Sequence, residues 1–136
     1  MTDVSSVFVV DDDHSVRRSL ARLLEAAGYR AEGFGSAADL LEQLPSRDLQ
    51  GPACALVDVR MPEITGFDLV QQLRRRSPDL PVIFITGHGD TAMAERAIRA
   101  GVSGFLVKPV DESLLLAEVE RALATSRQRL SLDQGR

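Results

Sequence analysis

Four short apolar runs in this sequence each end in polar side chains that could handle phosphate or a divalent cation. The runs and the side chains that follow them are residues 7–10 before Asp11, Asp12 and Asp13, residues 53–57 before Asp58, residues 82–85 before Thr86, and residues 105–107 before Lys108. If the runs are parallel strands of one sheet, their ends all meet at one edge. That edge, beyond the carboxyl ends of the strands, is where open α/β sheets place their sites.

The acidic side chains predict a metal site. Asp11, Asp12 and Asp58 would lie close together if the strands at residues 7–10 and 53–57 are neighbours. Clustered carboxylates repel one another, and some take up protons unless a cation joins them. Mg²⁺ would neutralise these carboxylates, because it typically binds one or two carboxylates plus a phosphate and keeps several waters. Capping of the next helix is an alternative for the first acids, since a helix N-terminus favours negative charge, but it does not account for Asp58.

Lys108 and Thr86 extend the set at the same edge. A lysine ammonium is a compact charge that can neutralise a phosphoryl oxygen, and a threonine hydroxyl can donate a hydrogen bond to another. Read singly, each is most often an ordinary solvated residue at a strand end. Together with the acids at matching strand ends, they favour a site for phosphate.

Length, charge and cysteine content bound the class of protein. The 136 residues fit one domain and can bury a real core. The formal net charge of -4 argues against direct binding of nucleic acid through its phosphates. The single cysteine, Cys54, excludes a disulfide within the chain. With no apolar segment long enough for a membrane and no signal pattern at the N-terminus, we expect a cytoplasmic protein.

Helical and strand periods alternate along the chain and would position these ends. Apolar residues recur at helical spacing across residues 16–27, before Gly28, and residues 30–34 form the most polar strand, which suits a sheet edge. Further helices are expected from Ser36 to Pro45, across residues 67–73, from a cap at Asp90 or Thr91 to just before Gly101, and after a cap at Asp111. The order predicts five βα units, and thus a parallel sheet with helices on both faces.

The strand-end residues resemble the receiver domain of two-component response regulators. The matching segments are residues 9–13, residues 56–62 with Gly66, residues 85–89 and residues 105–109. Each motif is weak alone, but the ordered set is specific, and residues 86–90 look most like receivers of transcriptional regulators. The resemblance implies a flavodoxin-like, doubly wound α/β fold with a five-stranded parallel sheet in the order 2-1-3-4-5 and five helices. It predicts a receiver domain at residues 1–125, with residues 126–136 as a helix extension or the start of a linker.

The resemblance also implies a role for each acid. Asp58 would be the phosphoryl acceptor, a nucleophile toward a phosphohistidine on a sensor histidine kinase. Mg²⁺ would be held by Asp11 and Asp12, with Asp58 and the backbone carbonyl of Arg60 as further ligands. Asp13 continues the acidic series, and the sequence leaves open whether it joins the metal site.

Further roles follow from the same resemblance. Thr86 and Lys108 would bind phosphoryl oxygens, and Thr86 with Phe105 would form the switch, although Phe105 is equally well explained as a core residue. Arg60 and His88 match positions that flank the phosphoryl group and tune its lifetime, with exposed loop residues as the alternative.

The sequence therefore predicts a phosphorylation-controlled switch rather than an enzyme. Phosphorylation would change the face made by the fourth helix, the fifth strand and the fifth helix, and would favour a homodimer through it. An aspartate-nucleophile phosphohydrolase is one rival, but such enzymes need an acid two residues after the nucleophile, where this chain has Arg60. A receiver-like interaction module that does not use phosphate is another, and Asp58, Thr86 and Lys108 count against it.

Overall fold

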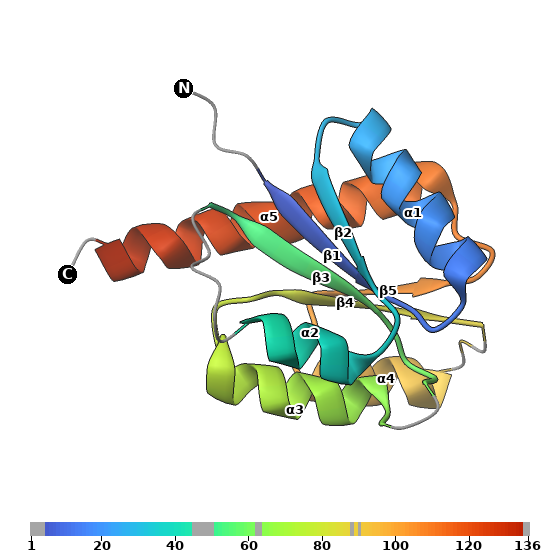
Figure 1. The fold of residues 1–136 in the computed structure, drawn as a ribbon. Helices are drawn as coiled ribbons and strands as arrows, with labels where there is room; N and C mark the ends of the chain where they lie inside the picture. Colours follow the sequence, from blue (N-terminus) through green and yellow to red (C-terminus); the bar gives the residue numbers. More distant parts are fainter. Residues whose placement is uncertain (1–4, 45–50, 62–63, 88, 90, 135–136) are drawn as a thin grey trace.

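The fold is built on one parallel sheet of five strands (Figure 1). The computed structural model describes residues 5–44, 51–61, 64–87, 89 and 91–134. The strands lie in the order β2-β1-β3-β4-β5, as the resemblance implies. Their bounds are β1 Ser6–Val10, β2 Arg30–Phe34, β3 Ala53–Asp58, β4 Val82–Thr86 and β5 Gly104–Val107.

Five helices alternate with the strands and cover both faces of the sheet (Figure 1). Their bounds are α1 His14–Ala26, α2 Ala37–Gln43, α3 Gly66–Arg76, α4 Thr91–Arg99 and α5 Glu112–Gln134. Helices α1 and α5 pack on one face around Leu24 and Leu115, whereas α2, α3 and α4 pack on the other around Leu40 and Leu69. The expected α/β architecture of five βα units is therefore confirmed.

Strand burial explains why the apolar runs are nearly continuous. All residues of β3 and β4 are buried, because helices cover both faces of these central strands. In β2, at the sheet edge, only Phe34 is buried. The polar composition of residues 30–34 thus reflects their edge position, as expected from the sequence.

Side-chain caps fix several helix starts. The Ser36 hydroxyl accepts a hydrogen bond from the Asp39 N–H, and an Asp111 carboxylate oxygen accepts one from the Leu114 N–H, so both predicted caps are confirmed. Thr91 is instead the first residue of α4, so it is not the cap. Asp90, the other candidate, and Pro45 lie outside the described residues.

Helix α5 continues well past the sheet (Figure 1). Its extension is held to the domain at Ser126, which is buried and whose hydroxyl accepts a 3.0 Å hydrogen bond from the N–H of Ala53 at the start of β3. Residues 126–134 are therefore one helix with the rest of α5, and a domain boundary at residue 125 stays a prediction. In the described part of the chain, no helix combines the length and apolar character that a membrane crossing requires.

Candidate phosphate and metal site

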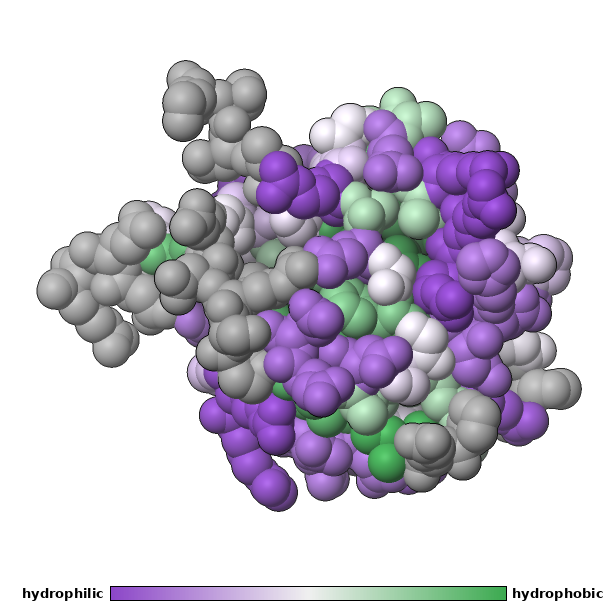
Figure 2. All heavy atoms as spheres, viewed as in Figure 1, coloured by the Kyte–Doolittle hydropathy of each residue, from purple (hydrophilic) through white to green (hydrophobic). Residues whose placement is uncertain are grey.

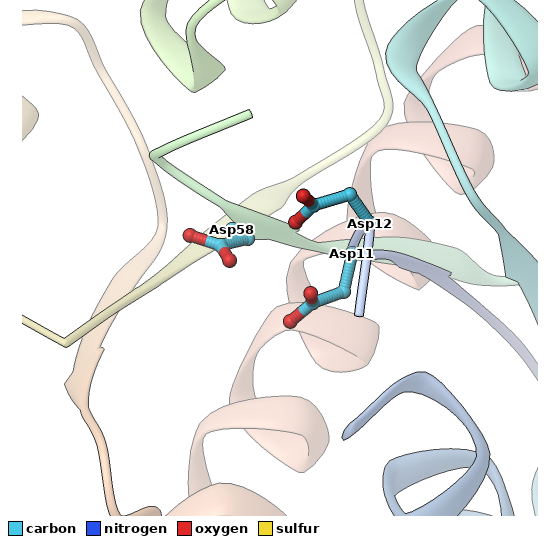
Figure 3. Close-up of side chains that lie close together, drawn as sticks. All are labelled: Asp11, Asp12 and Asp58. Carbon is cyan, nitrogen blue, oxygen red and sulfur yellow. The ribbon is translucent and has the colours of Figure 1, made fainter. Parts of the chain in front are cut away.

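Three carboxylates meet at the carboxyl edge of the sheet, as the strand ends predict (Figure 3). Val10 of β1 lies beside Val57 of β3, so the residues that follow them, Asp11 and Asp58, are neighbours. Oxygen atoms of Asp11, Asp12 and Asp58 all lie within 4.8 Å of one another. Asp11 and Asp58 are buried, whereas Asp12 is exposed. One side of the cluster is therefore open to solvent.

Asp13 does not belong to this cluster. Its carboxylate accepts hydrogen bonds from the N–H groups of Ser15 and Val16, so it is the N-cap of α1. Its own N–H donates to Asp11 Oδ1 at 2.9 Å and so holds the Asp11 carboxylate in place. One acid of the series therefore caps the helix, and the other two lie beside Asp58.

Lys108 supplies the positive charge of the site. From the end of β5, its Nζ donates to Asp11 Oδ2 and to Asp58 Oδ2, both at 3.2 Å. Since β4 lies between β3 and β5, the lysine side chain reaches over the end of β4 to make these contacts. Its side chain is 27% exposed, so Lys108 is less buried than the two carboxylates that it contacts.

The pKa shifts follow from this geometry. Burial raises the pKa of Asp11, and the negative charge of Asp58 adds to the rise, while the Asp13 N–H and Lys108 offset part of it. Burial lowers the pKa of Lys108, but its hydrogen bond to Asp58 and the charges of both acids outweigh burial and leave the pKa raised. Lys108 is therefore an ammonium at neutral pH, and one positive charge faces three carboxylates.

The donor set fits a hard divalent cation. All three ligand candidates offer carboxylate oxygen, one of them from an exposed side chain beside which water ligands have room. The single ammonium does not balance three carboxylates, so a cation would be favoured there. Arg60 is exposed, and its N–H donates to Asp58 Oδ1 at 3.0 Å. The metal role of its carbonyl stays a prediction.

The two switch candidates occupy different environments. Thr86 is the fully buried last residue of β4 and pairs with Val107 of β5, so it lies between the strands that carry Asp58 and Lys108. Phe105 is half-buried and packs against the core cluster on the α3 and α4 side. His88 lies outside the described residues.

The structure adds a groove that no motif indicated. It lies between α1 and the segment after β5, has a volume of ≈ 620 Å³ and borders Lys108. Its apolar lining includes Val16, Leu23 and Val110, which are half-buried rather than core residues. Helical spacing identified the apolar stripe of α1, but spacing alone does not tell whether another element covers it.

Comparison with known proteins agrees with the fold. The family model of the response regulator receiver domain matches residues 7–120. The response regulator protein TodT of Pseudomonas putida is 40% identical over 132 residues, which cover 96% of this chain and 57% of TodT. The transcriptional regulatory protein FixJ of Azorhizobium caulinodans is 39% identical over 129 residues, covering 95% of this chain and 60% of FixJ. This chain thus spans little more than half the length of these relatives.

A solved structure gives the same result in three dimensions. The solution structure of the beryllofluoride-activated NtrC4 receiver domain dimer superposes with a TM-score of 0.81 at 32% identity, covering 89% of this chain and 98% of that one. The sheet order, the carboxylate cluster with its lysine and these likenesses lead to one conclusion: this chain belongs to the response regulator receiver domain family of two-component signalling.

Proposed function

We propose that this domain accepts a phosphoryl group on Asp58 from a phosphohistidine of a sensor histidine kinase, in a reaction that depends on Mg²⁺. The observation that carries this proposal is the placement of Lys108 Nζ 3.2 Å from the carboxylates of both Asp11 and Asp58, inside a three-carboxylate cluster. An ammonium and a cation site beside one nucleophilic carboxylate suit phosphoryl transfer, where catalysis is mostly positioning and charge stabilisation.

The side chains divide the chemistry between them. An Asp58 carboxylate oxygen forms the new bond to phosphorus, the bond from phosphorus to the histidine nitrogen breaks, and the imidazole leaves with the electron pair. Lys108 neutralises charge on a phosphoryl oxygen, and the Thr86 hydroxyl donates to another. Mg²⁺, held by Asp11, Asp12 and Asp58 with the Arg60 carbonyl, would supply further charge neutralisation. Arg60 and His88 would tune the lifetime of the product.

The groove beside Lys108 offers a place for the kinase. It is mostly apolar, it is open to solvent, and it borders the ammonium that would contact the transferred group. A kinase segment packed on Val16 and Leu23 of α1 would bring its phosphohistidine to the carboxyl edge of the sheet. We therefore place the kinase contact at this groove.

The output surface is the face formed by α4, β5 and α5. Each of these elements exposes a large apolar side chain: Ile98 is 74% exposed, Val107 47% and Leu114 60%. Exposed apolar groups on neighbouring elements often mark contact surfaces. Because the solved NtrC4 receiver is described as an activated dimer, we propose that phosphorylation favours a homodimer of this chain through this face.

The switch would serve transcription through an attached or a separate output. The proposal rests on relatives such as FixJ, whose name describes a transcriptional regulatory protein. A transcription regulator of a bacterium works beside its DNA, so we propose a cytoplasmic location. Catalysis would be limited to the domain's own phosphorylation and dephosphorylation, so the domain is not an enzyme acting on a separate substrate.

Phosphorylation with a small phosphodonor tests the proposal. Parent protein incubated with phosphoramidate and Mg²⁺ should gain the mass of one phosphoryl group, and Asp58→Asn should gain none. Asp39→Asn is the matched control, because Asp39 is an exposed aspartate in the first turn of α2. Equal labelling of the Asp58→Asn variant, or a parent that takes up nothing in Mg²⁺, would contradict the assignment.

A further inference from the structure

Arg17 of α1 contacts the acidic turn in a way that no motif predicts. Its Nη1 donates a 2.7 Å hydrogen bond to the backbone carbonyl of Asp11, and its Nη2 lies 3.1 Å from His14 Nδ1. The Arg17 side chain is half-buried, whereas His14 and Arg18 of the same helix are exposed. A charged donor to a backbone carbonyl is among the stronger hydrogen bonds in proteins.

Two glycines leave the space through which Arg17 reaches this carbonyl. A Cβ at Gly33 of β2 would lie 2.9 Å from Arg17 Cγ and 3.0 Å from Cδ, closer than side chains tolerate. A Cβ at Gly35 would lie 3.4 Å from Arg17 Nη1. Because a Cβ at either position would lie against the Arg17 side chain, Gly33 and Gly35 together form one track under the arginine. The polar end of the edge strand is thus fitted to Arg17.

The contact fixes the peptide unit between the two metal-ligand candidates. The Asp11 N–H donates to the Phe34 carbonyl at 3.1 Å, and the Asp11 carbonyl accepts from Arg17. With both backbone groups of Asp11 bound, the plane of the next peptide is set, and this plane determines where the exposed Asp12 side chain starts. Asp12 then meets Asp11 and Asp58 within the 4.8 Å cluster (Figure 3).

We propose that Arg17, held on the Gly33 and Gly35 track, is a positioning residue for Mg²⁺ binding by Asp11 and Asp12. Partners that orient metal ligands commonly change metal affinity when removed. Arg17 acts through the backbone and does not itself touch the ion. This role depends on the Mg²⁺ site proposed above.

Positioning and simple charge predict opposite signs for the loss of Arg17. A positive charge near a cation site repels the cation, so by charge alone Arg17→Ala would bind Mg²⁺ more tightly. If Arg17 positions the acidic turn, Arg17→Ala binds Mg²⁺ more weakly. Gly33→Ala separates the two effects further, because it displaces the arginine stem without changing any charge.

The test measures Mg²⁺ affinity by calorimetry and by the rise in melting temperature with Mg²⁺ concentration. Arg17→Ala should raise the Mg²⁺ dissociation constant by about tenfold, and Gly33→Ala should raise it in the same direction. Arg17→Lys keeps the charge but loses the planar fork, so its affinity should be intermediate. Arg18→Ala removes the same charge from the exposed neighbouring residue and should leave affinity within about twofold of the parent, because salt screens an exposed charge.

Phosphorylation by phosphoramidate at limiting and at saturating Mg²⁺ gives a second readout. The rate deficit of Arg17→Ala should be large at limiting Mg²⁺ and should disappear at saturation, whereas general damage to the fold would persist. Melting in EDTA reports stability without the metal. If Arg17→Ala is unfolded in EDTA, the Mg²⁺ affinities of Gly33→Ala and Arg17→Lys test the positioning role in its place. Equal or tighter Mg²⁺ binding by the Arg17 and Gly33 variants overturns the positioning role alone. A parent that shows no Mg²⁺ response overturns the metal site, and this role with it.

Discussion

Replacing Lys108 by methionine tests whether the lysine balances the charge of the carboxylates. Lys108→Met keeps most of the side-chain volume and removes the ammonium, which lies 3.2 Å from both Asp11 Oδ2 and Asp58 Oδ2. The two carboxylates are nearly inaccessible, with side chains 2% and 9% exposed. In metal-free protein, the variant therefore leaves buried negative charges without their cation.

The expected loss of stability follows from the geometry. Each contact has a Coulomb energy of about 5 kcal/mol at an effective dielectric constant near 20, and desolvation of the groups offsets most of it. Breaking a buried ion pair typically costs about 3–5 kcal/mol, and the 27% exposure of Lys108 lowers this figure. We expect a loss of about 2–4 kcal/mol in EDTA, which corresponds to a fall in melting temperature of roughly 6–12 °C for a domain of this size.

Mg²⁺ should remove much of this penalty, because it places a new positive charge among the same carboxylates. Melting of parent and variant in EDTA and in millimolar Mg²⁺ measures the effect, and the Mg²⁺-induced rise should be larger in Lys108→Met. Since the pKa of Lys108 is raised, its contribution is fully present below its ordinary value of 10.5 and is lost only as the pH rises through the folded-state pKa. Measurements at pH 7.5 therefore report the charged form.

Arg121→Met is the control for this experiment. Arg121 pairs with Glu118 at 2.6 Å, but its side chain is 67% exposed, and such surface pairs contribute about 0.2–1 kcal/mol. Its small loss should be the same with and without Mg²⁺. If Lys108→Met also loses equal stability in EDTA and in Mg²⁺, the lysine acts by packing and the charge-balance reasoning is refuted.

Three further outcomes are expected. Thr86→Ala should still be phosphorylated but should show small NMR shifts in α4, β5 and α5 with beryllofluoride, and parent-like shifts there would disprove coupling through the hydroxyl. In EDTA, the free energy of unfolding should rise as the pH falls from neutral through the raised pKa of Asp11 toward 3.8, because the folded state then binds more protons than the unfolded state. Asp11→Asn should lose this part of the pH dependence. An unchanged pH dependence of the unfolding free energy would contradict the assignment. Arg96→Ala should speed amide exchange in α4, because the Arg96 guanidinium lies 4.1 Å from the Phe67 ring centroid. Such contacts contribute about 0.5–1 kcal/mol at exposed sites. Unchanged exchange would show that this contact does not hold α4.

The site was predictable because parallel strands bring their carboxyl ends to one edge. Once the apolar runs before Asp11, Asp58 and Lys108 are recognised as parallel strands of one sheet, their polar ends have to lie at the same edge. The edge position of residues 30–34 was equally predictable, because a strand with so many polar residues needs contact with solvent. These features depend on periodicity and order, which a sequence displays directly.

Features that depend on side-chain geometry were not predictable. Three consecutive aspartates look alike in sequence, and only the hydrogen bonds from Ser15 and Val16 show that Asp13 is the cap. The half-buried Val16 and Leu23 of α1 follow the same helical spacing as the buried Leu20 and Leu24. On the face of the domain seen in Figure 2, purple hydrophilic and green apolar surface interleave. Ser126 in the tail looks solvated in sequence, but its hydroxyl anchors the start of β3. Ser126 and Ala53 are far apart in the sequence, and nothing in the sequence distinguishes Asp13 from the two aspartates before it.

The position of Thr86 explains how one phosphoryl group could affect a surface that the site does not touch. Lys108 reaches Asp58 over the end of β4, so a phosphoryl group on Asp58 would lie beside Thr86. The next helix along the chain, α4, has one buried residue, Ala97, which is fewer than any other helix of the described structure has. A hydrogen bond from Thr86 to a charged acceptor contributes about 1.5–3 kcal/mol, enough to shift a two-state ratio by roughly 10- to 150-fold. Because displacement is easiest where the fewest buried contacts must be broken, that shift is expected in α4.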